Sequence, residues 1–380
     1  MVNKIQELYE AGQSVWYDNI QRRLLVNGEL AGMIERGEIR GVTSNPTIFM
    51  NAITKSDDYD AALAPLAKAG HSAEEIFWQL AVEDIQAAAD LFRPLYDMTD
   101  GGDGYVSLEV DPCLAHDTEG TVEAAKEVWQ RVARPNLMVK IPSTVAGLPA
   151  ITAAVAEGIN VNVTLIFALD RYLTVMDAYL TGLEQRVAAG LPVDRIASVA
   201  SFFVSRCDTK VDGRLMERVD RGGAHADPAE KLLGKAAIAN ARMAYGYYQK
   251  VFGSPRFEAL KAHGARAQRP LWASTSTKNP AYRDVIYVEE LIGPDTVNTM
   301  PPHTLVAFLD HGEVRPGSLE EDVVGAEQTL SELESLGISM CIATCELENE
   351  GVKSFADAYT ALLDAIEARR RAARPSSSKS

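Results

Sequence analysis

The sequence predicts an α/β protein folded as a (β/α)8 TIM barrel with extra terminal helices. Short apolar, β-branched runs alternate along the chain with longer segments of helical periodicity, a pattern typical of a parallel sheet covered by helices. Eight such runs can be distinguished, and eight parallel strands close a barrel. With 380 residues and 47% hydrophobic content, the chain is long enough for one large core, and barrels of this type often reach such lengths as a single domain.

The eight expected strands follow from apolar content and from the turn residues that bound each run. They are Ser14–Tyr17, Gly41–Ser44, Tyr105–Val110, Leu137–Ile141, Ile159–Leu165, Ile196–Phe203, Pro270–Ser274 and Val285–Leu291. A doubly wound open sheet is the alternative arrangement of the same elements. That fold usually carries a glycine-rich phosphate loop after its first strand, whereas Asp18–Arg22 contains no glycine. The barrel is therefore favoured.

Helices are expected between the strands. Ser72 and Glu75 have the spacing of a capping box, which predicts a helix that begins after Ser72. Other helices are predicted by apolar residues at intervals of three and four, over Thr121–Val132, Asp170–Ala188 and Ala229–Val251. The charged, glycine-containing segment Cys207–Pro228 is expected to be a mobile loop at the mouth of the barrel.

Domain organisation is expected to be simple. Residues 1–368 are predicted to form a single barrel domain, followed by a tail at 369–380 that is first basic and then serine-rich. Such a composition is typical of a solvated, disordered terminus. Binding of RNA or a membrane by the tail is the alternative, but basic tails are commonly only solvated.

Composition limits the possible partners. The net charge is -16, which argues against general binding of nucleic acid or anionic membranes. No apolar run approaches the length of a membrane span, and the N-terminus lacks the apolar stretch of a signal peptide. The four cysteines form no pattern suited to a disulfide framework, and a metal site at Cys341 and Cys345 would need two further ligands. We therefore expect a cytoplasmic protein with reduced thiols and no metal.

Lys140 is the most informative residue because it lies inside the apolar run Leu137–Pro142. A lysine in a buried strand loses most of its hydration, which disfavours the ammonium form. The neutral amine is a nucleophile toward carbonyl carbon. The alternative is a strand-end lysine that reaches solvent or pairs with a carboxylate.

Polar residues gather at the C-terminal ends of the expected strands, where a closed barrel has its active site. Each one alone could cap a helix, pair with a charge or satisfy loop backbone. A lysine, two carboxylates and several amide or hydroxyl groups at one barrel mouth together predict a Schiff-base aldol site. The set is Asp18, Asn45, Glu109, Lys140, Asn162, Thr164, Ser201 and Ser274.

Five segments, in order along the chain, resemble the transaldolase family. They are Gly41–Phe49, Val106–Asp111, Val139–Gly147, Ile159–Phe167 and Ser201–Arg206. The resemblance runs from about Val15 to Met300–Pro301 and on to the C-terminal helix. It implies that Lys140 forms the Schiff base, that Asp18 is the base of the retro-aldol step, and that Glu109 and Thr164 hold a catalytic water. Asn45, Asn162 and Ser201 would then bind hydroxyl groups of the ketose.

The resemblance also implies a phosphate site. Arg206 stands at a position where the family has an arginine. Lys278 is the best match for a second basic residue, in a segment with two extra residues, and Ser274 is a further donor. A lysine gives up the bidentate geometry of an arginine. Phe202 and Ser205 depart from the proline and glycine of many members, which affects loop shape and leaves the catalytic set intact.

The function implied is that of a transaldolase, a transferase of the pentose phosphate pathway. It would move a dihydroxyacetone unit from sedoheptulose 7-phosphate to glyceraldehyde 3-phosphate, giving erythrose 4-phosphate and fructose 6-phosphate. Its partners would be these sugar phosphates, with no nucleic acid, no membrane and no cofactor, because the sequence contains no nucleotide fingerprint. Whether it is a monomer or a homodimer stays open.

Two alternatives remain. One is a fructose-6-phosphate aldolase, which the resemblance makes less favoured because those enzymes carry a glutamine where this chain has Glu109. The other is a non-catalytic sugar-phosphate-binding protein on the same fold. The intact set of Lys140, Asp18 and Glu109 argues against it.

Overall fold

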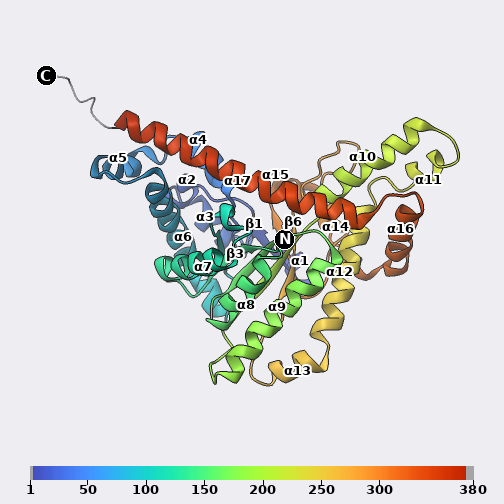
Figure 1. The fold of residues 1–380 in the computed structure, drawn as a ribbon, viewed down its shortest axis with the longest axis horizontal. Coiled ribbons are helices and arrows are strands. Elements are labelled where there is room, and N and C mark those ends of the chain that lie inside the picture. The colour runs from blue at the N-terminus through green and yellow to red at the C-terminus, as the bar shows by residue number, and fades with distance from the viewer. Residues whose placement is uncertain (1–2, 374–380) are drawn as a thin grey trace.

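The computed structural model describes residues 3–373, which form a curled parallel sheet wrapped by helices, consistent with a TIM-type fold (Figure 1). The sheet has seven strands in the order β1-β7-β6-β5-β4-β3-β2. The strands are β1 Gln13–Tyr17, β2 Val106–Glu109, β3 Leu137–Pro142, β4 Val161–Ile166, β5 Ser198–Phe203, β6 Arg269–Ala273 and β7 Thr296–Met300. Nearly all of their residues are buried, as expected where helices cover a parallel sheet.

Val42 lies between the two edge strands of the sheet. It forms one parallel bridge to Tyr17 of β1 and another to Val106 of β2. The backbone N–H of Tyr17 donates to the Gly41 carbonyl at 2.9 Å, and that of Ser107 donates to the Val42 carbonyl at 2.9 Å. The strand expected at Gly41–Ser44 is thus reduced to one bridging residue.

One or more helices separate each strand from the next. They are α1 Lys4–Glu10, α2 Arg22–Val26, α3 Glu29–Glu35, α4 Pro46–Thr54, α5 Asp60–Ala69, α6 Ala73–Met98, α7 Thr118–Val132, α8 Gly147–Ala156, α9 Leu169–Ala188, α10 Ser205–Arg221, α11 Ala226–Glu230, α12 Ala236–Phe252, α13 Pro255–Lys261, α14 Ile286–Glu289, α15 Pro302–His311, α16 Val323–Ser335 and α17 Met340–Ala373, with short 3-10 turns at Pro112–Leu114 and Ser318–Glu320. The predicted capping box is confirmed, with Ser72 and Glu75 each accepting the other's backbone N–H. No helix within residues 3–373 has the length and hydropathy needed to cross a bilayer.

The predicted eighth strand at Val285–Leu291 is wrong. Its apolar residues belong to the short helix α14, and the strand of this part of the sheet is β7, Thr296–Met300. A short apolar run does not distinguish a strand from a buried helical turn. The β7 segment was missed because three of its five residues in Thr-Val-Asn-Thr-Met are polar, although all five are buried.

Two segments expected to be irregular are helical. Most of the expected loop at 207–228 belongs to α10 and α11. Helix α17 runs through Ala373, past residue 369 where we expected the tail to begin. Arg369 donates to the Asp60 carboxylate at 2.9 Å, so an ion pair keeps this end of the helix against α5. Residues 374–380 lie outside the described part of the chain.

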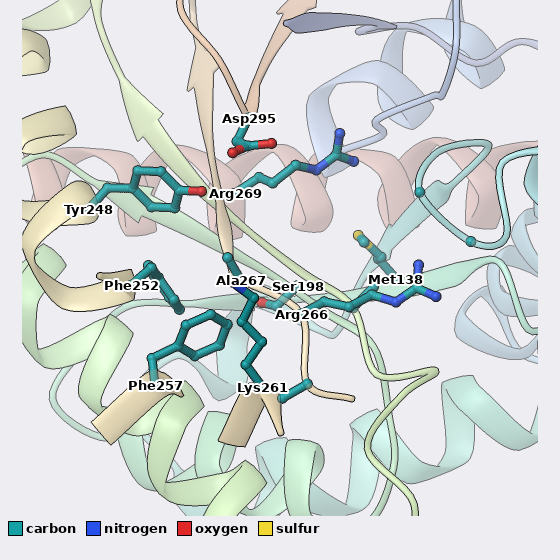
Figure 2. A pocket seen from close by; sticks show the side chains of 14 residues that line it. Met138, Ser198, Tyr248, Phe252, Phe257, Lys261, Arg266, Ala267, Arg269 and Asp295 are labelled. Carbon is teal, nitrogen blue, oxygen red and sulfur yellow. The ribbon is translucent and has the colours of Figure 1, made fainter. Parts of the chain in front are cut away.

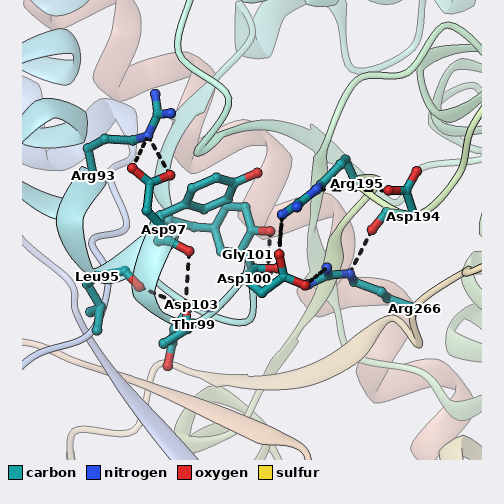
Figure 3. Close-up of polar contacts among 12 residues, drawn as sticks. Arg93, Leu95, Asp97, Thr99, Asp100, Gly101, Asp103, Asp194, Arg195 and Arg266 are labelled. Atoms are coloured by element: carbon teal, nitrogen blue, oxygen red, sulfur yellow. Dashed lines mark hydrogen bonds and ion pairs between the residues drawn. The ribbon is translucent and has the colours of Figure 1, made fainter.

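The N-terminal ends of the strands are tied together by charged loops. Asp100, in the turn after α6, is 2.7 Å from Arg195 and 3.4 Å from Arg266 (Figure 3). These arginines precede β5 and β6. A cavity of about 460 Å³ lies on this side, with Tyr248 and Phe252 opposite Arg266 and Arg269 (Figure 2). The predicted site residues line a different cavity, described next.

Candidate active site

A cavity of about 430 Å³ opens at the C-terminal ends of the strands. Eight of the ten predicted site residues line it, although they come from distant parts of the chain. They are Asp18, Asn45, Lys140, Thr164, Ser201, Arg206, Ser274 and Lys278. Glu109 and Asn162 do not line the cavity and are buried beside it, 5% and 0% exposed. The C-terminal strand ends converge here as the sequence predicted.

Strand β3 carries Lys140, and strand register brings it beside Glu109. The two residues are paired directly across β2 and β3, so both side chains leave the sheet on the same face. The ammonium Nζ lies 3.3 Å from Glu109 Oε2 and donates to the Ser44 carbonyl at 2.9 Å. The sequence left open whether Lys140 is a buried nucleophile or a lysine paired with a carboxylate. In the structure it is paired with Glu109 and also lines the cavity.

Glu109 is held in an unusual environment for a carboxylate. Neither of its oxygens has a hydrogen bond of good geometry within the described residues, and the hydroxyl of Thr164 also lacks one. The contact with Lys140 is thus an ion pair more than an aligned hydrogen bond. Burial raises the pKa of Glu109, and the charge of Lys140 opposes that rise. A carboxyl group with a raised pKa can both give and take a proton nearer neutral pH.

Asp18 follows β1 and points into the cavity. Its Oδ1 accepts a hydrogen bond from Thr43 Oγ1 at 2.7 Å, and Thr43 Oγ1 lies 2.6 Å from Thr299 Oγ1. Burial raises the pKa of Asp18, against the opposing effects of the Thr43 hydrogen bond and of the charge on Lys140. The raised pKa makes the ionised carboxylate a stronger base than an exposed aspartate.

A chain of hydrogen bonds lies beneath the cavity floor. Ser201 Oγ donates to Asn162 Oδ1 at 2.7 Å, and Asn162 Nδ2 donates to Ser107 Oγ at 3.0 Å. Asn162 therefore fixes the Ser201 hydroxyl from below. Asn45 caps α4 by accepting from the Ile48 N–H at 2.9 Å, which leaves its NH2 group to contact a substrate.

Two cations share one side of the cavity. The Arg206 guanidinium lies 5.3 Å from the Phe203 ring centroid, and Lys278 donates to Ser276 Oγ at 2.5 Å. Burial lowers the pKa of both groups, and the Arg206 charge lowers that of Lys278 further. Ser274 adds a hydroxyl, 3.0 Å from Ser205 Oγ, on a backbone with φ 56°. An anion between these donors would relieve the repulsion of the cations.

Sequence reasoning missed several cavity residues. They are Thr43, Ser276, Thr299, His303 and Phe355. His303 lies in the first turn of α15, and Thr299 lies in the overlooked strand β7. Thr43 is two residues before Asn45, so its position near the site could have been predicted from the sequence. Phe355 comes from α17, far along the chain, and no local signal placed it here.

The described side chains also bear on whether the protein holds a metal ion. Within residues 3–373, no cluster of three or more His, Cys, Asp or Glu side chains has the arrangement of a metal site. The four cysteines form no disulfide. Metal-independent activity stays a prediction.

The fold and the site define a class of protein. A lysine at the C-terminal edge of a curled parallel sheet lies here beside a carboxylate of raised pKa, and a second such carboxylate and two cations line the same cavity. This arrangement is the kind that an aldol enzyme working through a lysine imine requires.

Comparison with known proteins gives the family. The family model described as Transaldolase/Fructose-6-phosphate aldolase matches residues 15–366. A protein named Transaldolase from Parafrankia sp. (strain EAN1pec) is 52% identical over 366 residues, which are 96% of this chain and 98% of that protein. The Transaldolase of Thermobifida fusca (strain YX) is also 52% identical, over the same shares of both chains. That of Mycolicibacterium smegmatis is 48% identical over 97% of each chain. The chain belongs to the transaldolase/fructose-6-phosphate aldolase family.

Proposed function

We propose that this protein is a transaldolase that moves a dihydroxyacetone unit from sedoheptulose 7-phosphate to glyceraldehyde 3-phosphate. The products are erythrose 4-phosphate and fructose 6-phosphate. The observation that carries the proposal is the contact of 3.3 Å between Lys140 Nζ and Glu109, next to a cavity that Asp18 also lines. A nucleophile and two proton-transfer groups thus lie within one small volume.

The first step forms the imine. The Lys140 amine attacks the ketose carbonyl carbon, and the resulting carbinolamine loses water to give a protonated imine. Glu109 is close enough to Lys140 to exchange protons during these steps, directly or through a water molecule held with Thr164. The raised pKa of Glu109 suits it to both directions of proton transfer.

The second step breaks the carbon–carbon bond. Asp18 takes the proton from the hydroxyl of the leaving fragment, and the electron pair of the broken bond moves into the imine to give an enamine. The aldose phosphate leaves, and a second aldehyde reacts with the enamine by the reverse path. Asn45 and Ser201 bind the hydroxyls of the retained unit, and Asn162 positions Ser201 through the hydrogen bond of 2.7 Å.

Phosphate recognition falls to the cationic side of the cavity. Arg206 and Lys278 supply charge, and Ser274 supplies a hydroxyl donor. The net charge of the chain is -16, so these two residues provide local attraction for a phosphate against the overall charge.

We also propose the finer description of the fold and setting. The Val42 bridges to both sheet edges support a (β/α)8 barrel with Gly41–Thr43 as one of its eight strands. The barrel would form a single domain that includes the whole of α17, through Ala373. The proposed reaction places the protein in the pentose phosphate pathway and in the cytoplasm.

Fructose-6-phosphate aldolase activity is the second candidate, because the matching family model covers both activities. An assay with fructose 6-phosphate alone separates them. A transaldolase converts little beyond about one equivalent per site until erythrose 4-phosphate is added, since the enamine stays on Lys140. Sedoheptulose 7-phosphate then accumulates. Steady release of dihydroxyacetone without an acceptor would favour the aldolase.

A further inference from the structure

Helix α17, the long red helix in Figure 1, runs across the molecule from α5 toward α10 and α16. Its buried face includes one row of residues spaced by four, and Phe355 in this row is the member that reaches the catalytic cavity. The row is Ala343, Leu347, Gly351, Phe355 and Tyr359. A helix from the end of the chain therefore supplies part of the wall of the proposed active site.

Close packing on either side fixes the position of Phe355. One turn earlier, a Cβ on Gly351 would lie 2.9 Å from Leu165 Cδ2, so the glycine lets the helix pack closely against the Leu165 side chain near the end of β4. Leu165 has a φ of 60° and directly follows Thr164. One turn later, the Tyr359 ring meets Phe77 edge-on, with centroids 5.5 Å apart.

Ion pairs anchor the helix at both ends. Toward its start, Lys210 of α10 lies 3.2 Å from Glu346 and 2.5 Å from Glu350. Toward its end, Arg369 lies 2.9 Å from Asp60 of α5. Phe355 lies between these anchors, 3% exposed, with its ring centroid 5.9 Å from Lys140 Nζ.

We infer that Phe355 is a specificity-determining residue whose ring keeps water away from the intermediate on Lys140, and so makes transfer prevail over hydrolysis. The inference rests on the proposed transaldolase function and goes beyond it. An aromatic ring supplies no proton and only a weak hydrogen-bond acceptor to a water molecule near the nitrogen. Its electron-rich face can also stabilise the positive charge of the protonated imine.

The chemistry explains why such a wall matters. Release of free dihydroxyacetone requires a proton to add to the enamine carbon, which restores the imine. Water then adds to the imine carbon and loses a proton, the carbon–nitrogen bond breaks, and the nitrogen takes a proton, which returns the lysine amine. Each stage needs water or a proton donor beside the bound carbon unit, and an apolar wall limits both.

The experiment measures how the intermediate is partitioned. Dihydroxyacetone release from fructose 6-phosphate alone is compared with transfer to erythrose 4-phosphate, for the wild type and for Phe355→Ala. The ratio of release to transfer should rise about tenfold or more when the apolar wall is removed. Phe355→Leu keeps an apolar side chain of similar size and should restore a ratio within about threefold of the wild type.

Two further variants guard against a folding artefact, because truncation of a buried phenylalanine is costly. Phe355→Val removes less volume and should raise the ratio in the same direction. Leu362→Ala truncates another fully buried residue of α17 that lies outside the cavity, and its ratio should match the wild type. Borohydride trapping of the substrate on Lys140 verifies an intact site in each variant.

The outcomes separate the two proposals. A wild type that never transfers the unit refutes the proposed function itself. If the wild type transfers but Phe355→Ala and Phe355→Val keep its ratio while still forming the Lys140 adduct, the inference about Phe355 is refuted alone. An equal rise in Leu362→Ala would also refute it, since general loosening of α17 would then be the cause.

Discussion

Glu109 and Lys140 are direct partners in the register of β2 and β3, and their side chains meet at 3.3 Å. Adjacent parallel strands place such partners on the same face of the sheet. The resulting ion pair is almost fully buried, with side chains 3% and 6% exposed. Removal of either partner leaves a buried charge without compensation, which is expensive. The pair is thus placed by the backbone and is sensitive to any change in either residue.

Lys140→Ala should abolish transfer, because it removes the amine beside Glu109 that forms the imine. In the wild type, fructose 6-phosphate with sodium borohydride should leave a reduced dihydroxyacetone unit on Lys140. Peptide mass mapping locates the adduct, and Lys278, the other lysine of the cavity, is the internal control. An adduct on Lys278, or persistent activity with no adduct, would show that the nucleophile is misassigned.

Glu109→Gln should slow transfer by about 10²-fold or more, because a glutamine cannot exchange protons with the carbinolamine. The amide keeps the shape of the side chain but removes the negative charge beside Lys140. Imine formation should be the step that slows most. The rate at which borohydride traps substrate in a single turnover should therefore fall together with the steady-state rate. A variant that traps substrate at the wild-type rate would exclude Glu109 from that step.

Much of the site could be predicted from the sequence because its residues lie in or directly after strands that are recognisable from their apolar residues. Lys140, Thr164 and Ser201 all follow this rule, since their strands are buried on both faces. The curled parallel sheet then brings the C-terminal ends of these strands together, whatever the loops are.

The remaining features depend on tertiary context. The mostly polar strand β7 was missed, while the apolar residues of α14 were taken for a strand, because burial inside this sheet does not require apolar sequence. Phe355 reaches Lys140 from 215 positions away, on a helix that packs closely against Leu165 at Gly351. No periodicity within α17 indicates which of its buried residues will face the cavity.

Arg206→Ala should raise the KM for phosphorylated substrates by about 10- to 100-fold, the usual loss for a hydrogen bond to a charged group. The KM for a dihydroxyacetone donor without phosphate should change little. Lys278→Ala should act in the same direction but more weakly, since a lysine makes no bidentate contact. An equal rise in KM for both classes of substrate would indicate that Arg206 stabilises the fold and does not bind the phosphate.

Prolonged dialysis against EDTA should leave activity unchanged. In the proposed mechanism the protonated imine accepts the electrons of the broken bond, so a divalent ion has no role to fill. The measurement is the transfer rate before and after dialysis, with a mock dialysis in parallel. Loss of activity that zinc restores would point instead to a metal-dependent aldolase.

Asp18→Asn should lower activity by about 10²- to 10⁴-fold, the typical share of a general base, and yet stabilise the fold. Burial raises the pKa of Asp18 above its ordinary value of 3.8, and this effect outweighs the Thr43 hydrogen bond and the charges of Lys140, Arg206 and Lys278. The folded state therefore binds the Asp18 proton more tightly than the unfolded state does.

The sign of the pH dependence follows from this difference. As the pH rises from about 4, the unfolded chain loses this proton first, so the free energy of unfolding of the wild type decreases until the folded carboxyl is also ionised. Asp18→Asn removes this decrease in the free energy of unfolding, because asparagine does not ionise. Its stability should equal the wild type near pH 4 and exceed it at neutral pH by about 0.5–2 kcal/mol, the usual gain from relieving a functional site.

Denaturant unfolding at several pH values measures the effect. The exposed Asp57→Asn is the matched control and should show no such divergence from the wild type. The pH profile of kcat/KM in the wild type should in turn fall on the acid side at a higher pH than an exposed aspartate would give, because the base must be ionised to accept the hydroxyl proton. If Asp18→Asn is less stable than the wild type at neutral pH, the charges of Lys140, Arg206 and Lys278 outweigh the cost of burying the carboxylate, and its ionised form holds the cationic site together.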